Sequence, residues 1–133
     1  MEKVKLQAQY GLYINGQWRN ASDGATYNAE SPADGSHLAV CAQGSREDVE
    51  AASAAAWEAF KTWKKTTPAQ RAALLNKIAD IIDANKEHLA MVESMDNGKP
   101  IRETMNVDIP MAAEHFRYFA GCILAEEGQA SVL

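Results

Sequence analysis

The chain has little cysteine, no long apolar run and no excess of positive charge. Its two cysteines, Cys41 and Cys122, lie far apart and have no metal-ligand spacing. The longest apolar runs, such as residues 51–56, are far too short to span a bilayer. Residues 1–10 lack the apolar core of a signal peptide. We therefore expect a cytoplasmic protein with reduced thiols.

The charge balance argues against two classes of partner. Thirteen Lys and Arg face 18 Asp and Glu, which gives a net charge of −5. This is the wrong sign for binding nucleic acid or an anionic membrane. A composition of 47% hydrophobic and 23% charged residues over 133 positions is typical of one soluble globular domain. We expect neither nucleic-acid nor membrane partners.

The residues by themselves offer no catalytic site, since neither a Gly-x-Gly-x-x-Gly nor a Walker-type loop is present. Cys122 and His115 are seven positions apart on one expected helix, about 10 Å along its axis. That is too far for a nucleophile–base hydrogen bond, so we favour a small buried thiol and a surface histidine. Cys41 and His37 would lie roughly 13 Å apart along a strand, and a metal site there would need further ligands that the sequence does not offer.

The first third of the sequence predicts strands and turns. Asn15-Gly16 supplies two positive-φ positions between the apolar runs 12–14 and 17–19, which predicts a β-hairpin with a type I′ turn. Further short strands are expected at 26–29 and 37–42, with turn residues at 23–24 and 32–35.

From Ser45 the apolar period changes from 2 to 3.6, which predicts helices. Ser45 is expected to cap the first helix, with Asp48 completing a capping box. One face of this helix carries the predicted buried stripe: Val49, Ala52, Ala56, Phe60 and Trp63. Acidic residues open the helix and lysines close it, which complements its dipole.

The second helix is expected to begin at Pro68, with Thr67 as its cap and Gln70 completing the capping box. Asn85 is expected to interrupt it, and a third helical stretch should end at Gly98. The predicted buried stripes of these two helices are Leu75, Ile78, Ala79 and Ile82, then Leu89, Val92 and Met95.

A last helix is expected near the C-terminal end. Pro110 should lie near its start, with Asp108 as a candidate cap, and Gly128 should end it. Residues 131–133 are apolar and strand-like, an unusual place for a domain to end. The predicted buried stripe is Ile109, Ala112, Phe116, Phe119 and Ile123.

Taken in order, these segments resemble the N-terminal part of the aldehyde dehydrogenases, from about Tyr13 to the last residue. No single motif identifies the family, but six in the right order and at the right spacing do. They are the hairpin 13–18, the "NPxxG"-like turn 31–35, the helices 46–63 and 68–80, the "LDNGKP"-like segment 95–100 and the "RYYAG"-like helix 115–121.

The resemblance implies an α/β fold. Residues 1–11 would form an N-terminal arm, and residues 12–133 an incomplete N-terminal part of the family's cofactor-binding domain. This part would be a β-hairpin and short strands followed by three to four helices, which would pack on the Rossmann-like sheet of the full enzyme. Without that sheet, the apolar helix faces should be exposed.

The resemblance also implies an activity: NAD(P)-dependent oxidation of an aldehyde to the carboxylic acid by a homo-oligomeric enzyme. Family members use a cysteine nucleophile, a glutamate that activates water, and cofactor contacts. We expect all of these beyond residue 133, so the chain alone should be inactive. Segment 97–104, with Phe119 and Cys122, most resembles bacterial enzymes for acetaldehyde or other short aliphatic aldehydes. The choice between NAD and NADP stays open.

One family site would lie partly within the chain. Members often hold a monovalent cation, K⁺ or Na⁺, and the resemblance points to Asp96 with backbone carbonyls near Ala29 and Glu30. Hard oxygen ligands suit such an ion. The alternative is that Asp96 only anchors the turn at Gly98.

Two alternatives to an enzyme fragment remain. The chain could be a complete helical interaction module that kept the ancestral sequence without the catalysis. It could also be a truncated gene product without activity of its own. The apolar residues 132–133 do not favour the first alternative.

Overall fold

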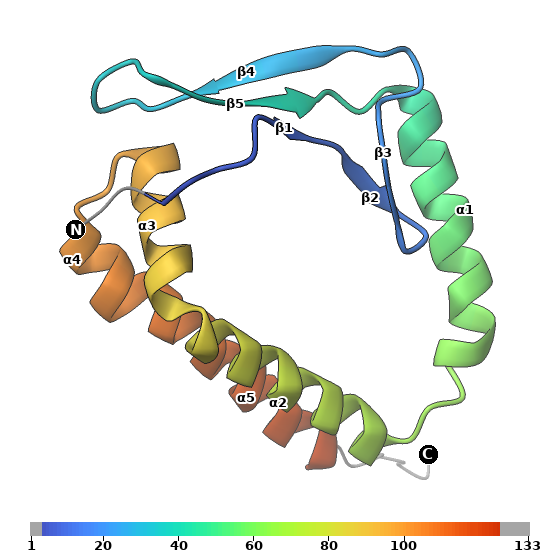
Figure 1. The fold of residues 1–133 in the computed structure, drawn as a ribbon. Helices are drawn as coiled ribbons and strands as arrows, with labels where there is room; N and C mark the ends of the chain where they lie inside the picture. The colour runs from blue at the N-terminus through green and yellow to red at the C-terminus, as the bar shows by residue number, and fades with distance from the viewer. Residues whose placement is uncertain (1–3, 126–133) are drawn as a thin grey trace, which may run out of the picture. The chain divides into compact units, whose positions relative to one another are not determined.

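The computed structural model describes residues 4–125, and its elements are labelled in Figure 1. The chain divides into two compact units. The first contains residues up to Lys65 together with Met91–Pro100, and the second contains Thr66–Ala90 and the residues from Ile101 onward. Gly128 and residues 131–133, for which a helix end and a strand-like stretch are predicted, lie outside the described residues. None of the helices within residues 4–125 is long and apolar enough to cross a membrane.

A three-stranded sheet lies in the first unit, with strand order β1-β5-β4. Strand β5 (His37–Ala42) pairs antiparallel with β4 (Thr26–Glu30), as Figure 1 shows. Strand β1 (Gln9–Tyr10) pairs in parallel with β5. The predicted strands 26–29 and 37–42 are confirmed, but residues 9 and 10 of the predicted arm join the sheet.

The predicted hairpin is also present. Strands β2 (Leu12–Ile14) and β3 (Gln17–Arg19) pair antiparallel with a two-residue turn between them. Asn15 has φ 52° and Gly16 has φ 76°. Two consecutive positive φ values are those of the predicted type I′ turn.

Helix α1 (Arg46–Trp63) follows β5. The predicted capping box is present, since the Ser45 hydroxyl accepts from the Asp48 N–H and the Asp48 carboxylate accepts from the Ser45 N–H. The predicted apolar stripe is largely unburied: Val49 is 65% exposed and Phe60 46%. Asp48 is the residue of this helix that is buried.

In the second unit, α2 (Pro68–Ala84) begins with the predicted capping box of Thr67 and Gln70. It ends at Asn85, and α3 (Lys86–Asn97) follows and runs on into the first unit. Gly98 has φ 78° after the last residue of α3, as expected for a helix stop.

The last helix differs from the prediction at its start. Helix α4 (Ile101–Glu103), the π-helix η1 (Thr104–Asp108) and α5 (Ile109–Leu124) are continuous. The predicted cap at Asp108 is therefore wrong, because this residue has helical φ and ψ and its side chain makes no cap bond. Pro110 has no N–H to donate, and the wider turn before it, closed by Ile109 N–H on the Thr104 carbonyl, accommodates this loss.

Helices α2 and α5 pack along each other in the second unit. Their contact is lined by alanines, since Ala79 and Ala113 are fully buried. Arg117 on α5 bridges to Asp80 and Asp83 on α2, at 2.8 and 2.7 Å.

Phe119 was predicted to lie in the buried stripe of the last helix, but its side chain is 57% exposed. Ala113 and Ala120 are the buried residues of α5, because the face turned toward α2 is centred on them. This exposure agrees with the expectation that apolar helix faces are uncovered without the sheet of the full enzyme, and burial of Phe119 in the complete enzyme stays a prediction.

Candidate functional site

The turn at residues 31–36 and the C-terminal end of α3 meet within the first unit. A Cβ atom built on Gly98 would lie 3.0 Å from Cγ of Pro32. A shallow pocket of about 200 Å³ is lined by residues of both segments, among them Ser31, Ser94 and Met95. Two motifs that carry the family resemblance, more than 50 residues apart in sequence, are therefore neighbours in space.

Local hydrogen bonds hold the 31–36 turn. Ser31 N–H donates to the Ser36 carbonyl at 2.9 Å, and Gly35 N–H donates to the Ser31 carbonyl at 2.8 Å. Asp34 Oδ1 accepts from both the N–H and the hydroxyl of Ser36, at 3.0 and 2.6 Å. Gly35 takes φ 70°, a conformation that glycine adopts without steric cost. The carboxylate of Asp34 thus stabilises the turn by accepting two hydrogen bonds from Ser36.

The end of α3 is held in a similar way. Gly98 N–H donates to the Ser94 carbonyl at 3.1 Å, and the Ser94 hydroxyl donates to the Lys99 carbonyl at 2.6 Å. Asn97 Oδ1 accepts from Lys99 N–H at 2.8 Å. These bonds come from Ser94 and Asn97 rather than from Asp96, which was the residue expected to anchor the turn if it did not bind a cation.

The residues of the expected cation site, Asp96, Ala29 and Glu30, all lie in the first unit. Asp96 and Glu30 are exposed and Ala29 is half-buried. The pKa of Tyr27, on the same strand as Ala29, is raised above its ordinary value. The charge of the Cys41 thiolate is the main cause, a hydrogen bond with Cys41 and burial add to it, and the Asp96 carboxylate contributes. The negative charge of Asp96 therefore contributes to the raised pKa of a residue on β4.

The backbone of β4 limits what Ala29 can offer to an ion. Gln43 N–H donates to the Ala25 carbonyl at 2.9 Å, and hydrogen-bonded pairs alternate along an antiparallel ladder. Ala29, opposite Ala39, therefore occupies a hydrogen-bonded position, and its carbonyl has one lone pair left. The register shift between Ala29 and Glu30 takes the next carbonyl out of this alternation. The expected cation site would therefore use the carboxylate of Asp96 and the backbone carbonyls of Ala29 and Glu30 as oxygen ligands.

Neither of the two Cys–His pairs considered in the sequence forms a candidate site in the described residues. Cys122 is exposed, so the prediction of a buried thiol is wrong: it lies on α5 away from the alanine contact with α2. Cys41 is half-buried and lies opposite Tyr27 in the sheet. His37 and His115 are exposed. Within residues 4–125, no group of three His, Cys, Asp or Glu side chains is placed to hold a metal ion.

Asp48 is a buried carboxylate whose oxygens are all engaged. Its side chain is 2% exposed. It accepts from the N–H of Ser22 and of Ser45, each at 3.0 Å, and from Nη2 of Arg19 at 3.0 Å. The two backbone N–H donors are the main reason that the pKa of Asp48 is lowered to about 2. A carboxylate held as an anion by three segments is suited to structure and not to proton transfer.

Sequence reasoning missed the partners of Asp48 outside the capping box. Ser22 and Arg19 are 26 and 29 residues away, and no local signal connects them with the start of α1. An arginine that ends a hairpin strand is ordinary in sequence.

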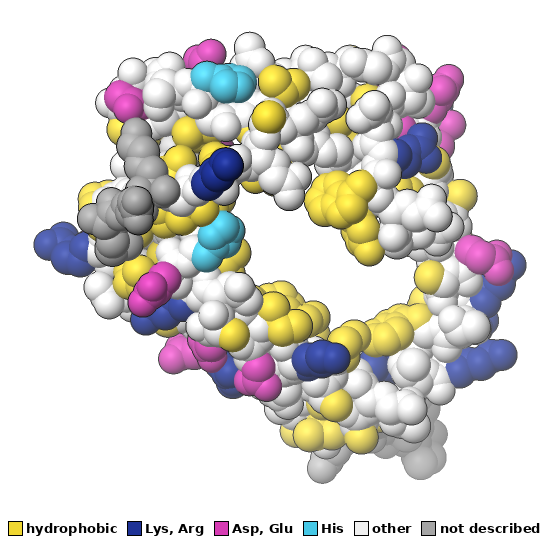
Figure 2. Space-filling view, in the orientation of Figure 1, with side chains coloured by type: hydrophobic (Ala, Val, Ile, Leu, Met, Phe, Trp, Pro, Cys, Tyr) yellow, Lys and Arg dark blue, Asp and Glu magenta, His cyan; other side chains and the backbone are white. Residues whose placement is uncertain are grey.

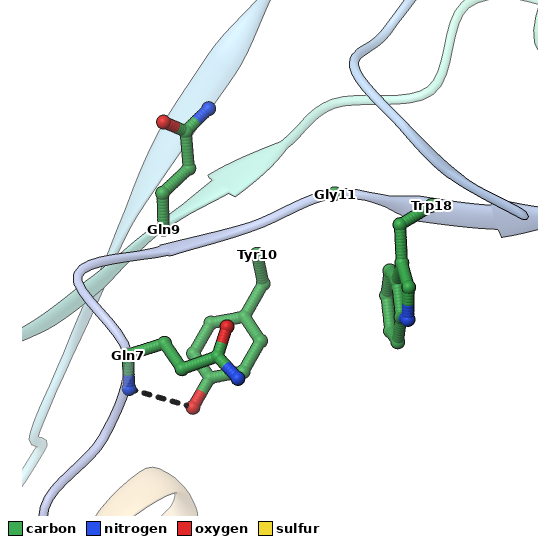
Figure 3. A pocket seen from close by; sticks show the side chains of 5 residues that line it. All are labelled: Gln7, Gln9, Tyr10, Gly11 and Trp18. Carbon is green, nitrogen blue, oxygen red and sulfur yellow. Dashed lines mark hydrogen bonds between the residues drawn. The ribbon is translucent and has the colours of Figure 1, made fainter.

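A pocket of about 310 Å³ lies beside the N-terminal strand, lined by Gln7, Gln9, Tyr10, Gly11 and Trp18 (Figure 3). The Tyr10 hydroxyl accepts from Gln7 N–H at 3.1 Å. Two amides and two aromatic rings make up its polar and apolar walls. These lining residues include neither a carboxylate nor an imidazole nor a thiol, and the hydroxyl of Tyr10 is engaged by Gln7 N–H.

Hydrophobic side chains are exposed on the face shown in Figure 2, and exposed aromatic side chains occur in both units. Trp57 on α1 is 69% exposed, and Tyr118 on α5 is 66% exposed. Helix α5 is apolar on two faces, of which α2 covers one. A helix that is apolar all round is normally buried, so these surfaces agree with the expectation that further structure covers them.

Comparisons with known proteins match almost the whole chain. The model of the aldehyde dehydrogenase family matches residues 18–132. The chain is 48% identical over 129 residues to a long-chain-aldehyde dehydrogenase of an Acinetobacter species, covering 97% of this chain and 26% of that protein. It is 46% identical over 123 residues to acetaldehyde dehydrogenase 2 of Cupriavidus necator, covering 92% of this chain and 24% of that protein.

Solved structures agree with these matches. The NAD⁺ complex of an aldehyde dehydrogenase from Bacillus cereus has a TM-score of 0.87 with this chain at 38% identity, covering 91% of this chain and 25% of that one. The predicted α/β fold is thereby confirmed. This chain spans about a quarter of the length of the relatives it matches, and it belongs to the aldehyde dehydrogenase family.

Proposed function

We propose that the chain is the N-terminal part of an NAD-dependent enzyme that oxidises an aldehyde to the carboxylic acid. The family match over residues 18–132 carries this proposal. Two relatives named for aldehyde oxidation, at 48% and 46% identity, support it. The NAD⁺ complex of the Bacillus cereus enzyme supports NAD as the hydride acceptor.

Within that enzyme the role of this segment is structural. Residues 12–133 contribute to the cofactor-binding domain, and residues 1–11 form an arm whose end pairs with β5. The nucleophile, the activating glutamate and the cofactor contacts come from the remaining polypeptide. In support, the buried carboxylate of Asp48 is committed to hydrogen bonds and neither thiol lies beside a base. The chain alone is therefore inactive.

The proposed substrate is a short aliphatic aldehyde such as acetaldehyde. The Cupriavidus necator relative supports this choice. The Acinetobacter relative, named for long-chain aldehydes, is about as similar. Comparing acetaldehyde with a long-chain aldehyde as substrates therefore tests the choice directly, and a preference for the long chain would contradict it.

We also place the enzyme in the cytoplasm as a homo-oligomer without nucleic-acid or membrane partners. The net charge of −5 supports the absence of anionic partners. Exposed aromatic side chains on α1 and α5 support burial against further protein. Light scattering of the intact enzyme tests the oligomer, and a monomer would contradict it.

We also propose that the intact enzyme binds a monovalent cation. Asp96 and the carbonyls of Ala29 and Glu30 would supply part of its oxygen ligands in the intact enzyme. The action of the Asp96 charge on β4 supports this placement, and carbonyl and carboxylate oxygens suit K⁺ or Na⁺. Thermal stability of the intact enzyme that rises with K⁺ or Na⁺, and no longer does so in Asp96→Ala, is the expected result.

A chimera tests the main proposal. This chain replaces the matching N-terminal quarter of the Acinetobacter enzyme, and NADH formation with aldehyde is followed by absorbance. We expect the chimera to be active and the chain alone to be inactive. An inactive but folded chimera would contradict the assignment. Turnover by the chain alone would place the chemistry within it, and Cys122 would then be the first residue to mutate.

A matched variant tests the assignment of the thiols. The chimera with both Cys41→Ser and Cys122→Ser should keep the activity of the unmodified chimera, because the nucleophile lies in the remaining polypeptide. Loss of activity in a chimera with an unchanged melting temperature would contradict this.

A further inference from the structure

The chain contains two Asn-Gly dipeptides, Asn15-Gly16 and Asn97-Gly98, and the structure gives them opposite surroundings. Asparagine is a chemically labile residue. In the labile reaction, the backbone nitrogen of the following residue attacks the side-chain amide carbon. Glycine is the following residue that hinders this approach least, because it has no side chain.

At the hairpin, both reacting groups are unrestrained. Asn15 is exposed at the tip, and within residues 4–125 its side-chain amide has no hydrogen-bond partner. The strand pairs of the hairpin run from Leu12–Arg19 to Ile14–Gln17, so the Gly16 N–H lies outside the ladder. A Cβ atom on Gly16 would meet nothing within 4 Å, which shows that the tip is open.

At the end of α3, both reacting groups are held. Asn97 Nδ2 donates to Glu93 at 2.6 Å, and Asn97 Oδ1 accepts from Lys99 N–H at 2.8 Å. The attacking nitrogen is occupied too, because Gly98 N–H donates to the Ser94 carbonyl at 3.1 Å. Attack at Asn97 therefore requires these hydrogen bonds to break first.

From this contrast we propose that Asn15 is a site of spontaneous deamidation in the folded protein and that Asn97 is protected from it. The Gly16 backbone nitrogen loses its proton and forms a bond to Cγ of Asn15. The bond from Cγ to the side-chain nitrogen breaks, and ammonia leaves with the proton. Water then opens the cyclic imide at one of its two carbonyls, which gives aspartate or isoaspartate at position 15. Water is the one co-reactant.

The reaction changes the contact of the hairpin with α1. Asn15 and Gly16 line a pocket of about 370 Å³ together with alanines of α1, including Ala52 and Ala56. Either product adds a negative charge beside this apolar surface. Isoaspartate also lengthens the backbone of a two-residue turn by one carbon, which is incompatible with the tight type I′ geometry. Modification at position 15 therefore loosens the hairpin from the helix.

Peptide mapping by mass spectrometry tests the proposal on the full chain. The protein is incubated in heavy-oxygen water under mildly alkaline conditions, and label incorporation is followed at both dipeptides. We expect Asn15 to react at least tenfold faster than Asn97, since breaking the three hydrogen bonds at Asn97 and Gly98 reduces the reactive population by roughly that factor or more. Equal rates, or a faster reaction at Asn97, would overturn the proposal.

Two controls separate structure from local sequence. In denaturant the hydrogen bonds are lost, and the two rates should converge. If the difference persists there, it does not come from the fold. In the folded protein, Glu93→Ala removes the acceptor of Asn97 Nδ2 and should raise the rate at Asn97 while leaving Asn15 unchanged. An unchanged rate at Asn97 in this variant would contradict protection by that hydrogen bond.

Discussion

Oδ1 of Asp48, in the first turn of α1, lies 3.0 Å from Nη2 of Arg19 at the end of the β2–β3 hairpin. The two side chains differ in exposure, since Asp48 is 2% exposed and Arg19 is 42% exposed. Solvent therefore screens the arginine side of the pair. The carboxylate is held mainly by the backbone donors of Ser22 and Ser45, so the loss of Asp48 should matter more than the loss of Arg19.

Substituting Asp48 tests this order. Asp48→Ala leaves the N–H groups of Ser22 and Ser45 without their acceptor, and unsatisfied buried donors are destabilising. We expect it to lower the melting temperature more than Ser45→Ala, which removes one cap at a cost of about 1 kcal/mol. Arg19→Ala should have the smallest effect of the three. Circular dichroism during heating measures all three, and a larger effect of Arg19→Ala would contradict this assignment.

The pH dependence of stability follows from the same carboxylate. Its pKa is lowered from 3.8 to about 2 in the folded state. The native state therefore favours the anion, and this contribution is fully present above the unfolded pKa. It is lost as the pH falls from about 4 toward 2. Urea unfolding across this range should show a steeper loss of stability in the wild type than in Asp48→Asn, and parallel curves would contradict the prediction.

Local signals in the sequence predicted most of the elements. The capping boxes at Ser45 and Thr67 and the turn at Asn15-Gly16 are confirmed because each depends on residues within four positions of one another. Features that depend on distant residues were missed. The hydrogen bonds of Asp48 to Ser22 and Arg19 join the start of α1 to segments 26 and 29 residues away.

The candidate site shows the same limit. The residues of the 31–36 turn and of the α3 end were each identified as turn signals, because Gly35 and Gly98 require positive φ. That Pro32 lies beside Gly98 at the end of α3 joins two segments far apart in sequence, and no local signal predicts it. The π-helix η1 also had no pattern of its own, since its apolar residues continue the helical period of α5.

The contact between Pro32 and Gly98 gives a prediction for glycine substitution. Gly98→Ala places a Cβ 3.0 Å from Pro32 Cγ in a backbone with φ 78°. The left-handed backbone alone costs a non-glycine residue roughly 1–2 kcal/mol. Gly24→Ala is the matched control, because it has φ 73° and no atom within 4 Å of the new Cβ. Chemical denaturation should show a greater loss of unfolding free energy for Gly98→Ala than for Gly24→Ala. Equal losses would show that Pro32 moves to accommodate the new Cβ.

The two phenylalanines of α5 should respond differently to truncation in this chain. Phe116 is half-buried, and Phe116→Ala should cost up to roughly 3 kcal/mol of unfolding free energy. Phe119 is 57% exposed, and Phe119→Ala should stay within about 0.5 kcal/mol. The same pair in the chimera shows whether further structure covers Phe119: a large loss there, with none in the isolated chain, would demonstrate such a contact.

Thr104 offers a test of the π-helix. Its side chain is fully buried, and its hydroxyl donates to the Ala90 carbonyl at 2.8 Å. Thr104→Val keeps the shape and loses the bond, at a cost of about 1–3 kcal/mol. Thr62→Val, which removes an exposed hydroxyl bonded to the Ala59 carbonyl, should have little effect. Thermal unfolding of both variants compares them, and equal losses would contradict a special role for Thr104.

The π-helix also determines which way α5 faces. A π-turn holds one residue more than the α-helical turn it replaces, and each residue of an α-helix turns the chain by about 100°. Segment Thr104–Asp108 therefore acts as a rotational offset between α4 and the helix that follows. Its length, and not only its side chains, keeps Ala113 and Ala120 toward α2. A substitution within this segment changes the side-chain contacts at one position. The loss of a single residue would instead rotate α4 relative to α5 by about 100°.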